Sequence, residues 1–215
     1  MINNIYCISG FGADERVFSK LNFGDHHVHF IPWLLPDKRE RLSDYARRMA
    51  EKIRHENPVL LGLSFGGMMC IEVAKFMSTQ KVILISSIKS LHEVPLWMKL
   101  AGKAQLNKIF PLRSFRLFEP IQNYNLGIEN KEELHLVREF RKNIGQQYTN
   151  WAANEILNWK NTWQPGNLFH IHGSKDHMFP IRNIKTKYVI KGGGHFMIMN
   201  RPEKVNEMLG KILPL

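Results

Sequence analysis

Short runs of apolar residues recur along this chain, and stretches with helical spacing separate them. The runs are too short for helices and are rich in Val, Ile, Leu and aromatic residues, which is typical of buried strands. We therefore predict six strands, at residues 5–10, 28–33, 59–61, 81–87, 168–172 and 187–191.

Helical spacing is clearest in residues 42–53, where apolar residues follow the i, i+3, i+4, i+7 pattern and Ser43 is a candidate N-cap. Residues 67–77 are apolar on most sides, which predicts a buried helix. A short helix is expected at residues 16–21. A final amphipathic helix begins near Pro202, because proline suits the first helical position.

The alternation of strands and helices stops in residues 88–166. This segment is rich in aromatic residues and shows helical patterns at about 94–109 and 131–159, but no strand pattern. Strands that alternate with helices form a mostly parallel sheet covered on both faces. The sequence predicts an α/β, doubly wound core, formed by residues 1–87 and 167–215, with a helical insert at 88–166.

Composition is that of a globular domain: 215 residues, of which 44% are hydrophobic and 23% charged. No apolar run reaches the roughly 18 residues that a membrane span needs, and the N-terminus does not resemble a signal peptide. We therefore expect a cytoplasmic protein without a membrane span. Cys7 and Cys70 both lie in apolar runs and lack metal-site spacing, which indicates buried thiols.

The formal net charge of +11 raises the question of nucleic-acid binding. The basic residues are dispersed, however, and no run of five like charges occurs. The densest stretch, residues 38–54, also carries acidic residues and has helical spacing, as a solvated helix face does. We therefore expect no nucleic-acid partner, whereas attraction of an anionic small molecule fits the charge better. The sequence does not indicate the oligomeric state.

Histidines suggest a metal site at two places, but neither has a complete ligand set. His27 and His29 would share one face of a strand, without a carboxylate or cysteine nearby to complete the coordination. His170 and His172 alternate on another strand and are better explained by packing or hydrogen bonding. We expect neither a metal nor a cofactor.

A candidate nucleophile lies in the segment Gly62-Leu-Ser-Phe-Gly66. A strand precedes this segment and a buried helix follows it, which is the context of a nucleophile elbow. The turn must reverse the chain within a few atoms, so glycine is needed where a Cβ would collide with the neighbouring turn. The pattern therefore predicts that Ser64 is exposed at the tip of a strained turn.

A serine hydroxyl needs a base to become a good nucleophile. The candidate base is His195, in Gly192-Gly-Gly-His-Phe196, and Asp176, which follows a strand, is the candidate partner that fixes its tautomer. His177 is a possible rival, but a neighbour so close to Asp176 would struggle to reach a serine on another strand. The chain order Ser, Asp, His is that of an elbow hydrolase.

An oxyanion formed at this site would need two N–H donors. The residue after the nucleophile supplies one, so we expect the backbone N–H of Phe65 to serve. The second donor is expected to be the N–H of Phe11, in the loop after the first strand.

With these pieces in place, the chain resembles the α/β-hydrolase superfamily, in its serine-nucleophile branch with a helical cap. The matching segments are Ser9-Gly-Phe-Gly12, Gly62-Leu-Ser-Phe-Gly-Gly67, His172-Gly-Ser-Lys-Asp176 with Pro180, and Gly193-Gly-His195 with Pro202-Glu203. The resemblance covers about 1–87 and 167–215 and implies Ser64 as nucleophile, His195 as base and Asp176 as its partner. The insert then corresponds to the family's variable cap.

Three features depart from the family pattern. Ser9-Gly10 stands where His-Gly is frequent, so the oxyanion loop must be supported differently. Pro32-Trp-Leu-Leu-Pro-Asp37 replaces the usual Asp-x-Pro-Gly-x-Gly loop. The first two strands of larger members are missing. None of these departures removes a member of the predicted triad.

Together these features predict a serine hydrolase that cleaves a carboxylic ester or thioester through an acyl-enzyme. Because aromatic residues crowd the insert, it is expected to cover Ser64 and to favour a substrate with an apolar acyl part. An aspartate nucleophile would instead suggest a dehalogenase or epoxide hydrolase. A carrier-protein or CoA thioesterase, an acyltransferase and a C–C bond hydrolase remain open on the same triad. A non-enzymatic receptor is disfavoured because it needs no triad.

Overall fold

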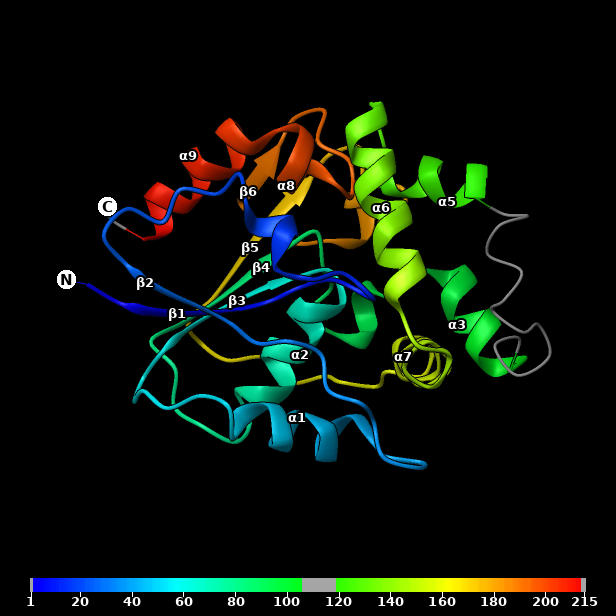
Figure 1. The fold of residues 1–215 in the computed structure, drawn as a ribbon, viewed down its shortest axis with the longest axis horizontal. Helices are drawn as coiled ribbons and strands as arrows, with labels where there is room; N and C mark the ends of the chain where they lie inside the picture. Colours follow the sequence, from blue (N-terminus) through cyan, green and yellow to red (C-terminus); the bar gives the residue numbers. More distant parts are fainter. Residues whose placement is uncertain (1, 106–118, 214–215) are drawn as a thin grey trace.

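A single parallel sheet forms the centre of the computed structural model, which describes residues 2–105 and 119–213 (Figure 1). Its strand order is β2-β1-β3-β4-β5-β6, and every neighbouring pair is parallel. The strands are β1 (Asn4–Ile8), β2 (His27–Phe30), β3 (Val59–Leu63), β4 (Lys81–Ile85), β5 (Leu168–Gly173) and β6 (Tyr188–Ile190). Each strand overlaps a predicted run, so the predicted doubly wound fold is confirmed.

Burial along the strands follows their position in the sheet. All of β3 is buried, and so is β4 beyond Lys81, because both strands are covered on two faces. The edge strands β2 and β6 are only partly buried. The apolar runs at 59–61 and 81–87 therefore mark the centre of the sheet.

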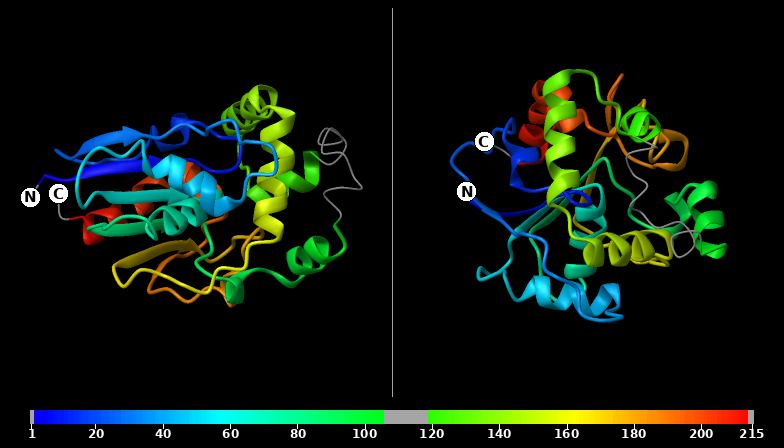
Figure 2. Two further views of the ribbon diagram at one scale, coloured as in Figure 1. Left: turned by 90° about the horizontal axis from the view of Figure 1, so that it is seen from below. Right: turned by 45° about the vertical axis from the view of Figure 1, so that its right-hand side comes forward.

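Helices cover both faces of the sheet (Figures 1 and 2). One face packs against α1 (Leu42–Ala50) and α2 (Phe65–Val73), and the other against η1 (Glu15–Phe18), α8 (Met197–Asn200) and α9 (Pro202–Ile212). Every residue of α2 is buried. Pro202 occupies the first turn of α9, as predicted.

Two predicted helix starts differ from the structure. Ser43 does not cap α1, because the helix already begins at Leu42 and Ser43 lies inside it. The Leu42 N–H donates to a carboxylate oxygen of Glu155 at 3.1 Å. A side chain distant in sequence therefore accepts the hydrogen bond at the start of this helix. The buried helix α2 begins at Phe65 rather than 67, since Gly66 and Gly67 are helical here although glycine usually disfavours helices.

Residues 88–166 contribute η2 (Leu91–Glu93), α3 (Leu96–Lys103), α5 (Glu119–Leu126), α6 (Lys131–Asn143) and α7 (Gln146–Leu157). These helices lie beside the carboxyl ends of the strands (Figures 1 and 2). The described residues of this segment contain no strand. A last short helix, η4 (Ile181–Asn183), follows β5.

The single helix predicted for residues 131–159 is wrong. The chain leaves the helical conformation at Ile144 (φ −76°, ψ 124°) and Gly145 (φ −74°, ψ 144°), so α6 and α7 are separate helices. Ile144 packs against Gly12, and Gly145, a residue that disfavours helix interiors, follows it at the break. The predicted helix at 94–109 corresponds to α3, and its last four residues, 106–109, lie outside the described residues.

Within residues 2–105 and 119–213, the helices all lack the length and apolar character that a membrane crossing requires.

Candidate active site

Ser64 is the only residue between the end of β3 and the start of α2. Its backbone adopts φ 52° and ψ −117°, a strained conformation for a residue with a side chain. A Cβ on Gly62 would overlap the backbone of Gly66 and Gly67, and one on Gly66 would overlap the carbonyl oxygens of Ile8 and Ser9. Only glycine allows the turn to be this tight.

The elbow is also fixed from the neighbouring strand. The Ser64 N–H donates to the Ile85 carbonyl at 2.9 Å, and the Ser87 hydroxyl donates to the Ser64 carbonyl at 2.7 Å. Gly67 packs so closely against the Ser87 side chain that a Cβ on Gly67 would lie 2.5 Å from Ser87 Oγ. Sequence reasoning did not single out Ser87, because nothing local marks a serine at a strand end as a brace for another turn.

The structure brings the three predicted triad side chains together. His195 lies in the turn between β6 and α8, and its Nε2 is 2.9 Å from Ser64 Oγ. Its Nδ1 is 2.9 Å from Asp176 Oδ2. A proton on Nδ1 donates to the carboxylate, so Nε2 is left to accept the proton of the serine hydroxyl. His195 and Asp176 are buried, and Ser64 is half-buried.

Asp176 lies just beyond β5 and is surrounded by polar groups that contact its carboxylate. Its Oδ1 accepts the Phe179 N–H at 2.8 Å, and its Oδ2 lies 3.5 Å from His172 Nε2. Burial by itself raises the pKa of this carboxyl, but the charge and hydrogen bond of His195, with His172 and the Phe179 N–H, outweigh it. The pKa of Asp176 is therefore lowered, which keeps the group ionised beside the imidazole.

His170 and His172 form a buried pair behind Asp176. His172 Nε2 donates to the Phe179 carbonyl at 2.8 Å, so its Nδ1 accepts from His170 Nε2 at 3.2 Å. Burial, together with the charge of a protonated His172, lowers the pKa of His170 well below its usual value. Burial also lowers the pKa of His172. Both rings are thus neutral, and they bond to protein groups as the sequence suggested.

His177, the possible rival base, lies elsewhere. Its ring packs on Tyr124 of α5 with 4.4 Å between centroids, and its side chain is exposed. His195, not His177, is the histidine within hydrogen-bonding distance of Ser64.

The turn that carries His195 is attached to the helical segment 88–166. The Phe196 N–H donates to the Leu126 carbonyl at 2.8 Å, and the Asn200 side chain donates to the Gly127 carbonyl at 3.0 Å. Gly127 (φ 72°) also packs against Gly194. The end of α5 therefore helps to set the position of the imidazole.

The two predicted oxyanion donors lie on the segments that border Ser64. Phe65 is the first residue of α2, where a backbone N–H has no acceptor within its own helix. Gly10, which precedes Phe11, packs closely against Ser64, since a Cβ on Gly10 would lie 3.5 Å from the Cβ of Ser64. The helix start also directs a positive dipole end at the site.

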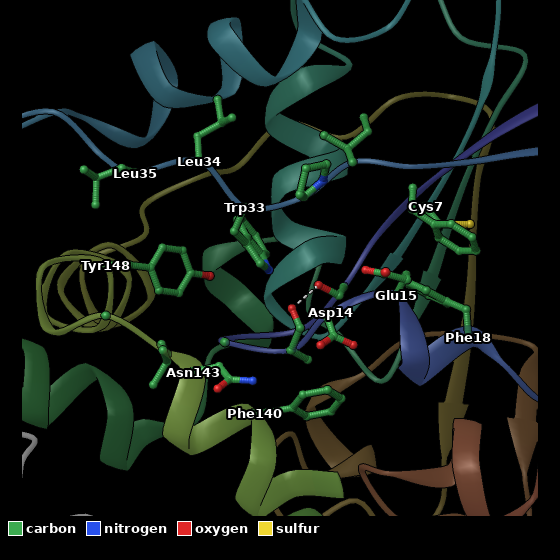
Figure 3. Close-up of a pocket in the computed structure, with 18 residues that line it drawn as sticks. Cys7, Asp14, Glu15, Phe18, Trp33, Leu34, Leu35, Phe140, Asn143 and Tyr148 are labelled. Atoms are coloured by element: carbon green, nitrogen blue, oxygen red, sulfur yellow. Dashed lines mark hydrogen bonds between the residues drawn. The ribbon is translucent and has the colours of Figure 1, made fainter.

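The structure contains a cavity of about 540 Å³. Figure 3 shows the residues that line it. Its walls come from the turn after β1, the segment after β2, and the α6–α7 junction, including Ser9, Gly12, Trp33, Phe140 and Tyr148. Ser64, Asp176 and His195 do not line it. The cavity therefore borders the turn that carries Phe11, through Ser9, Gly12 and Ala13, and its lining is mainly apolar.

The described residues contain no group of three or more His, Cys, Asp or Glu side chains arranged to hold a metal ion. His29 instead stacks on Tyr6, with 4.6 Å between ring centroids, and contacts Asn4. Cys7 and Cys70 are free and buried, as predicted.

Sequence comparison places the chain in a known family. Residues 5–208 match the alpha/beta hydrolase family, so the chain belongs to it. Membership of this family, together with esterases and lipases among the solved structures of the same fold, indicates that the protein is an enzyme. None of the curated proteins matches the chain in sequence.

Several solved structures share the fold. An esterase from Thermogutta terrifontis is 17% identical with a TM-score of 0.69, covering 99% of this chain and 89% of the esterase. MenH from S. aureus is 19% identical with a TM-score of 0.72, covering 99% of this chain and 93% of MenH. An epoxide hydrolase from Bacillus megaterium is 12% identical with a TM-score of 0.64, covering 100% of this chain and 94% of the epoxide hydrolase. At these identities the likeness concerns the fold alone.

Proposed function

We propose that this enzyme is a serine hydrolase that cleaves a carboxylic ester or thioester through an acyl-enzyme. The observation that carries the proposal is the position of His195, with one ring nitrogen 2.9 Å from Ser64 Oγ and the other 2.9 Å from Asp176 Oδ2. This is the arrangement that activates a serine hydroxyl for attack on a carbonyl.

In the proposed reaction, Ser64 Oγ attacks the carbonyl carbon while His195 Nε2 takes the hydroxyl proton. The N–H groups of Phe65 and Phe11 stabilise the oxyanion of the tetrahedral intermediate. When the intermediate collapses, His195 returns the proton to the departing alcohol or thiol. Water then attacks the acyl-enzyme, with His195 again as the base, and releases the acid. Asp176 holds the imidazole tautomer throughout, and the proposed steps call for no cofactor or metal.

Aromatic packing supports a substrate with an apolar acyl part. Aromatic side chains surround the oxyanion segments: Tyr148 of α7 lies 6.0 Å from the Phe11 ring, and Trp151 lies 6.1 Å from the Phe65 ring, between centroids. We therefore propose that residues 88–166 act as a cap, distinct from the core at 1–87 and 167–215, which excludes water from the site.

A carrier-protein or CoA thioesterase is the second candidate. The net charge of +11 favours an anionic substrate, because a positive protein attracts a phosphate-bearing leaving group over long range. This version predicts that thioester hydrolysis slows as salt is raised, whereas hydrolysis of a neutral ester does not.

A fluorophosphonate probe tests the proposal on the purified enzyme. We expect stoichiometric labelling, located on Ser64 by peptide mass spectrometry, and turnover of p-nitrophenyl esters or acyl thioesters. Ser64→Ala should abolish labelling and reduce turnover by about 10⁴-fold or more, without loss of fold. Labelling at another residue, or turnover in Ser64→Ala close to that of the wild type, would contradict the mechanism.

A further inference from the structure

The turn that carries Phe11 is held by an indole from a different loop. Trp33, in the segment after β2, donates its Nε1–H to the Gly10 carbonyl at 3.0 Å. The same carbonyl accepts the Ala13 N–H at 3.1 Å, so both of its lone pairs are used. Figure 3 shows Trp33 between Tyr148 of α7 and the turn that carries Asp14.

This hydrogen bond sets the direction of the Phe11 N–H. The Gly10 carbonyl and the Phe11 N–H belong to one trans peptide, which is planar, so the two groups point in opposite directions. When Trp33 and Ala13 hold the carbonyl on their side, the N–H is directed to the other side. Gly10 is the residue in that turn that packs against Ser64.

Trp33 also contacts the residue that carries the other oxyanion donor. Its ring stacks on the Phe65 ring, with 5.0 Å between centroids and 10° between planes. One half-buried side chain therefore contacts both Gly10–Phe11 and Phe65. It reaches them from the Pro32–Asp37 segment, which departs from the family's usual sequence.

We propose that Trp33 is a positioning residue of the oxyanion hole. Its indole N–H holds the Gly10–Phe11 peptide so that the Phe11 N–H faces the developing oxyanion, and its ring supports Phe65. Trp33 does not touch the substrate carbonyl. The inference rests on the proposed serine mechanism. It adds that Trp33 supports the oxyanion loop in this chain, which has Ser9 where the family often has histidine.

The first test is Trp33→Phe, which keeps an aromatic ring and removes the donor. Complete loss of an oxyanion donor costs about 10²–10³ in kcat, so a donor that is only misdirected should cost about 10–100-fold. The substrate KM should change less than about threefold, because the interaction is made in the transition state. A trifluoromethyl ketone inhibitor, which forms an oxyanion on serine, should bind more weakly by the same factor as kcat/KM falls.

Trp159→Phe is the matched control. Trp159 is buried in the hydrophobic cluster against which Trp33 packs, and it donates its Nε1–H to a carboxylate oxygen of Glu72 at 2.8 Å. Trp159→Phe thus removes an indole hydrogen bond that does not reach the Phe11 turn, and kcat should stay within about threefold of the wild type. An equal loss in both variants would show that Trp33 acts only through packing, and would overturn the proposal.

A second variant covers the case in which Trp33→Phe fails to fold. Incorporation of 3-benzothienylalanine at position 33 keeps the shape of the indole and replaces its N–H by sulfur. We expect the same loss of kcat, about 10–100-fold, with an unchanged melting temperature. A kcat equal to that of the wild type in this variant would overturn the role of Trp33. Wild-type enzyme that hydrolyses no ester or thioester would instead overturn the proposed function.

Discussion

The two turns that border Ser64 are held in place by different means. The elbow at residues 62–67 is shaped by backbone packed against backbone, since a Cβ at Gly62 or Gly66 would overlap main-chain atoms. The turn at residues 9–13 is held by side chains: Trp33 bonds to the Gly10 carbonyl, and the Ser9 hydroxyl donates to the Ala13 carbonyl at 2.6 Å. A turn of the first kind fails when an atom is added, and one of the second kind fails when an atom is removed.

The largest expected effect on stability comes from the addition of one methyl group to the elbow. In Gly66→Ala the new Cβ meets the carbonyl oxygens of Ile8 and Ser9, which belong to a buried strand end and cannot retreat. We expect the free energy of unfolding to fall by about 3 kcal/mol or more. Gly166→Ala is the matched control, because a Cβ at this position would have no atom within 4 Å. Its effect in chemical denaturation should stay within about 0.5 kcal/mol.

A change of pH should alter stability through the buried histidine pair behind Asp176. The pKa values of His170 and His172 are lowered by burial, so below about pH 6.5 the unfolded chain binds protons that the folded chain does not. Stability therefore rises with pH up to about 6.5 and falls as pH drops below it. We expect a loss of about 2 kcal/mol between about pH 6.5 and pH 5, measured by urea unfolding.

His170→Gln tests the source of this pH dependence. The substitution removes one of the two buried imidazoles, so the decline of stability below about pH 6.5 should become less steep. Asp176 does not contribute in this window: its lowered pKa stabilises the fold above the unfolded value, and that contribution is lost only at more acidic pH. An unchanged slope in His170→Gln would exclude the histidine pair as the cause.

The elbow also accepts a side-chain hydrogen bond from Ser87, and removal of this bond measures how little the elbow depends on it. Ser87→Ala removes the hydrogen bond to the Ser64 carbonyl, at an expected cost of about 1 kcal/mol. The neighbouring Ser86 is the control, since its buried hydroxyl has no hydrogen-bond partner among the described residues. Ser86→Ala should be neutral or slightly stabilising in thermal unfolding. A larger cost for Ser87→Ala than for Gly66→Ala would reverse the comparison.

The smallest expected effect comes from the other turn. Ser9→Ala removes the hydrogen bond to the Ala13 carbonyl but leaves Trp33 in place, so kcat should fall by about threefold with an unchanged KM. Because both side chains hold the same turn, Ser9→Ala combined with Trp33→Phe should deviate from the product of the single effects. Strict multiplicativity in steady-state kinetics would show that the two supports act independently.

The same contrast explains which parts of the site the sequence predicts. Glycines in the elbow are required by the local backbone, so Gly62 and Gly66 identify the turn and Ser64 at its tip without reference to the rest of the chain. Asp176 and His195 are predictable because parallel strands end at one edge of the sheet. The sheet itself follows from the apolar runs, all six of which overlap observed strands.

Features that depend on distant contacts could not be predicted. Trp33 reads as an ordinary aromatic residue until the structure brings its indole to Gly10. The α1 start is bonded by Glu155, more than a hundred residues away, and Ser43 therefore has no capping role. At the break, Ile144 contacts the distant Gly12, whereas the apolar periodicity of residues 131–159 continues across it.

The hydrogen bonds from the His195 turn to Leu126 and Gly127 have a consequence for how such enzymes change over evolution. Phe196 and Asn200 donate to backbone carbonyls at the end of α5, so the acceptors depend on the path of the chain and not on side-chain identity. Point mutations in α5 that keep the path of its backbone therefore leave these acceptors in place. An exchange of the whole segment, in contrast, would remove part of the support for the proposed base. Substitution within this segment is therefore expected to disturb the triad less than exchange of the whole segment.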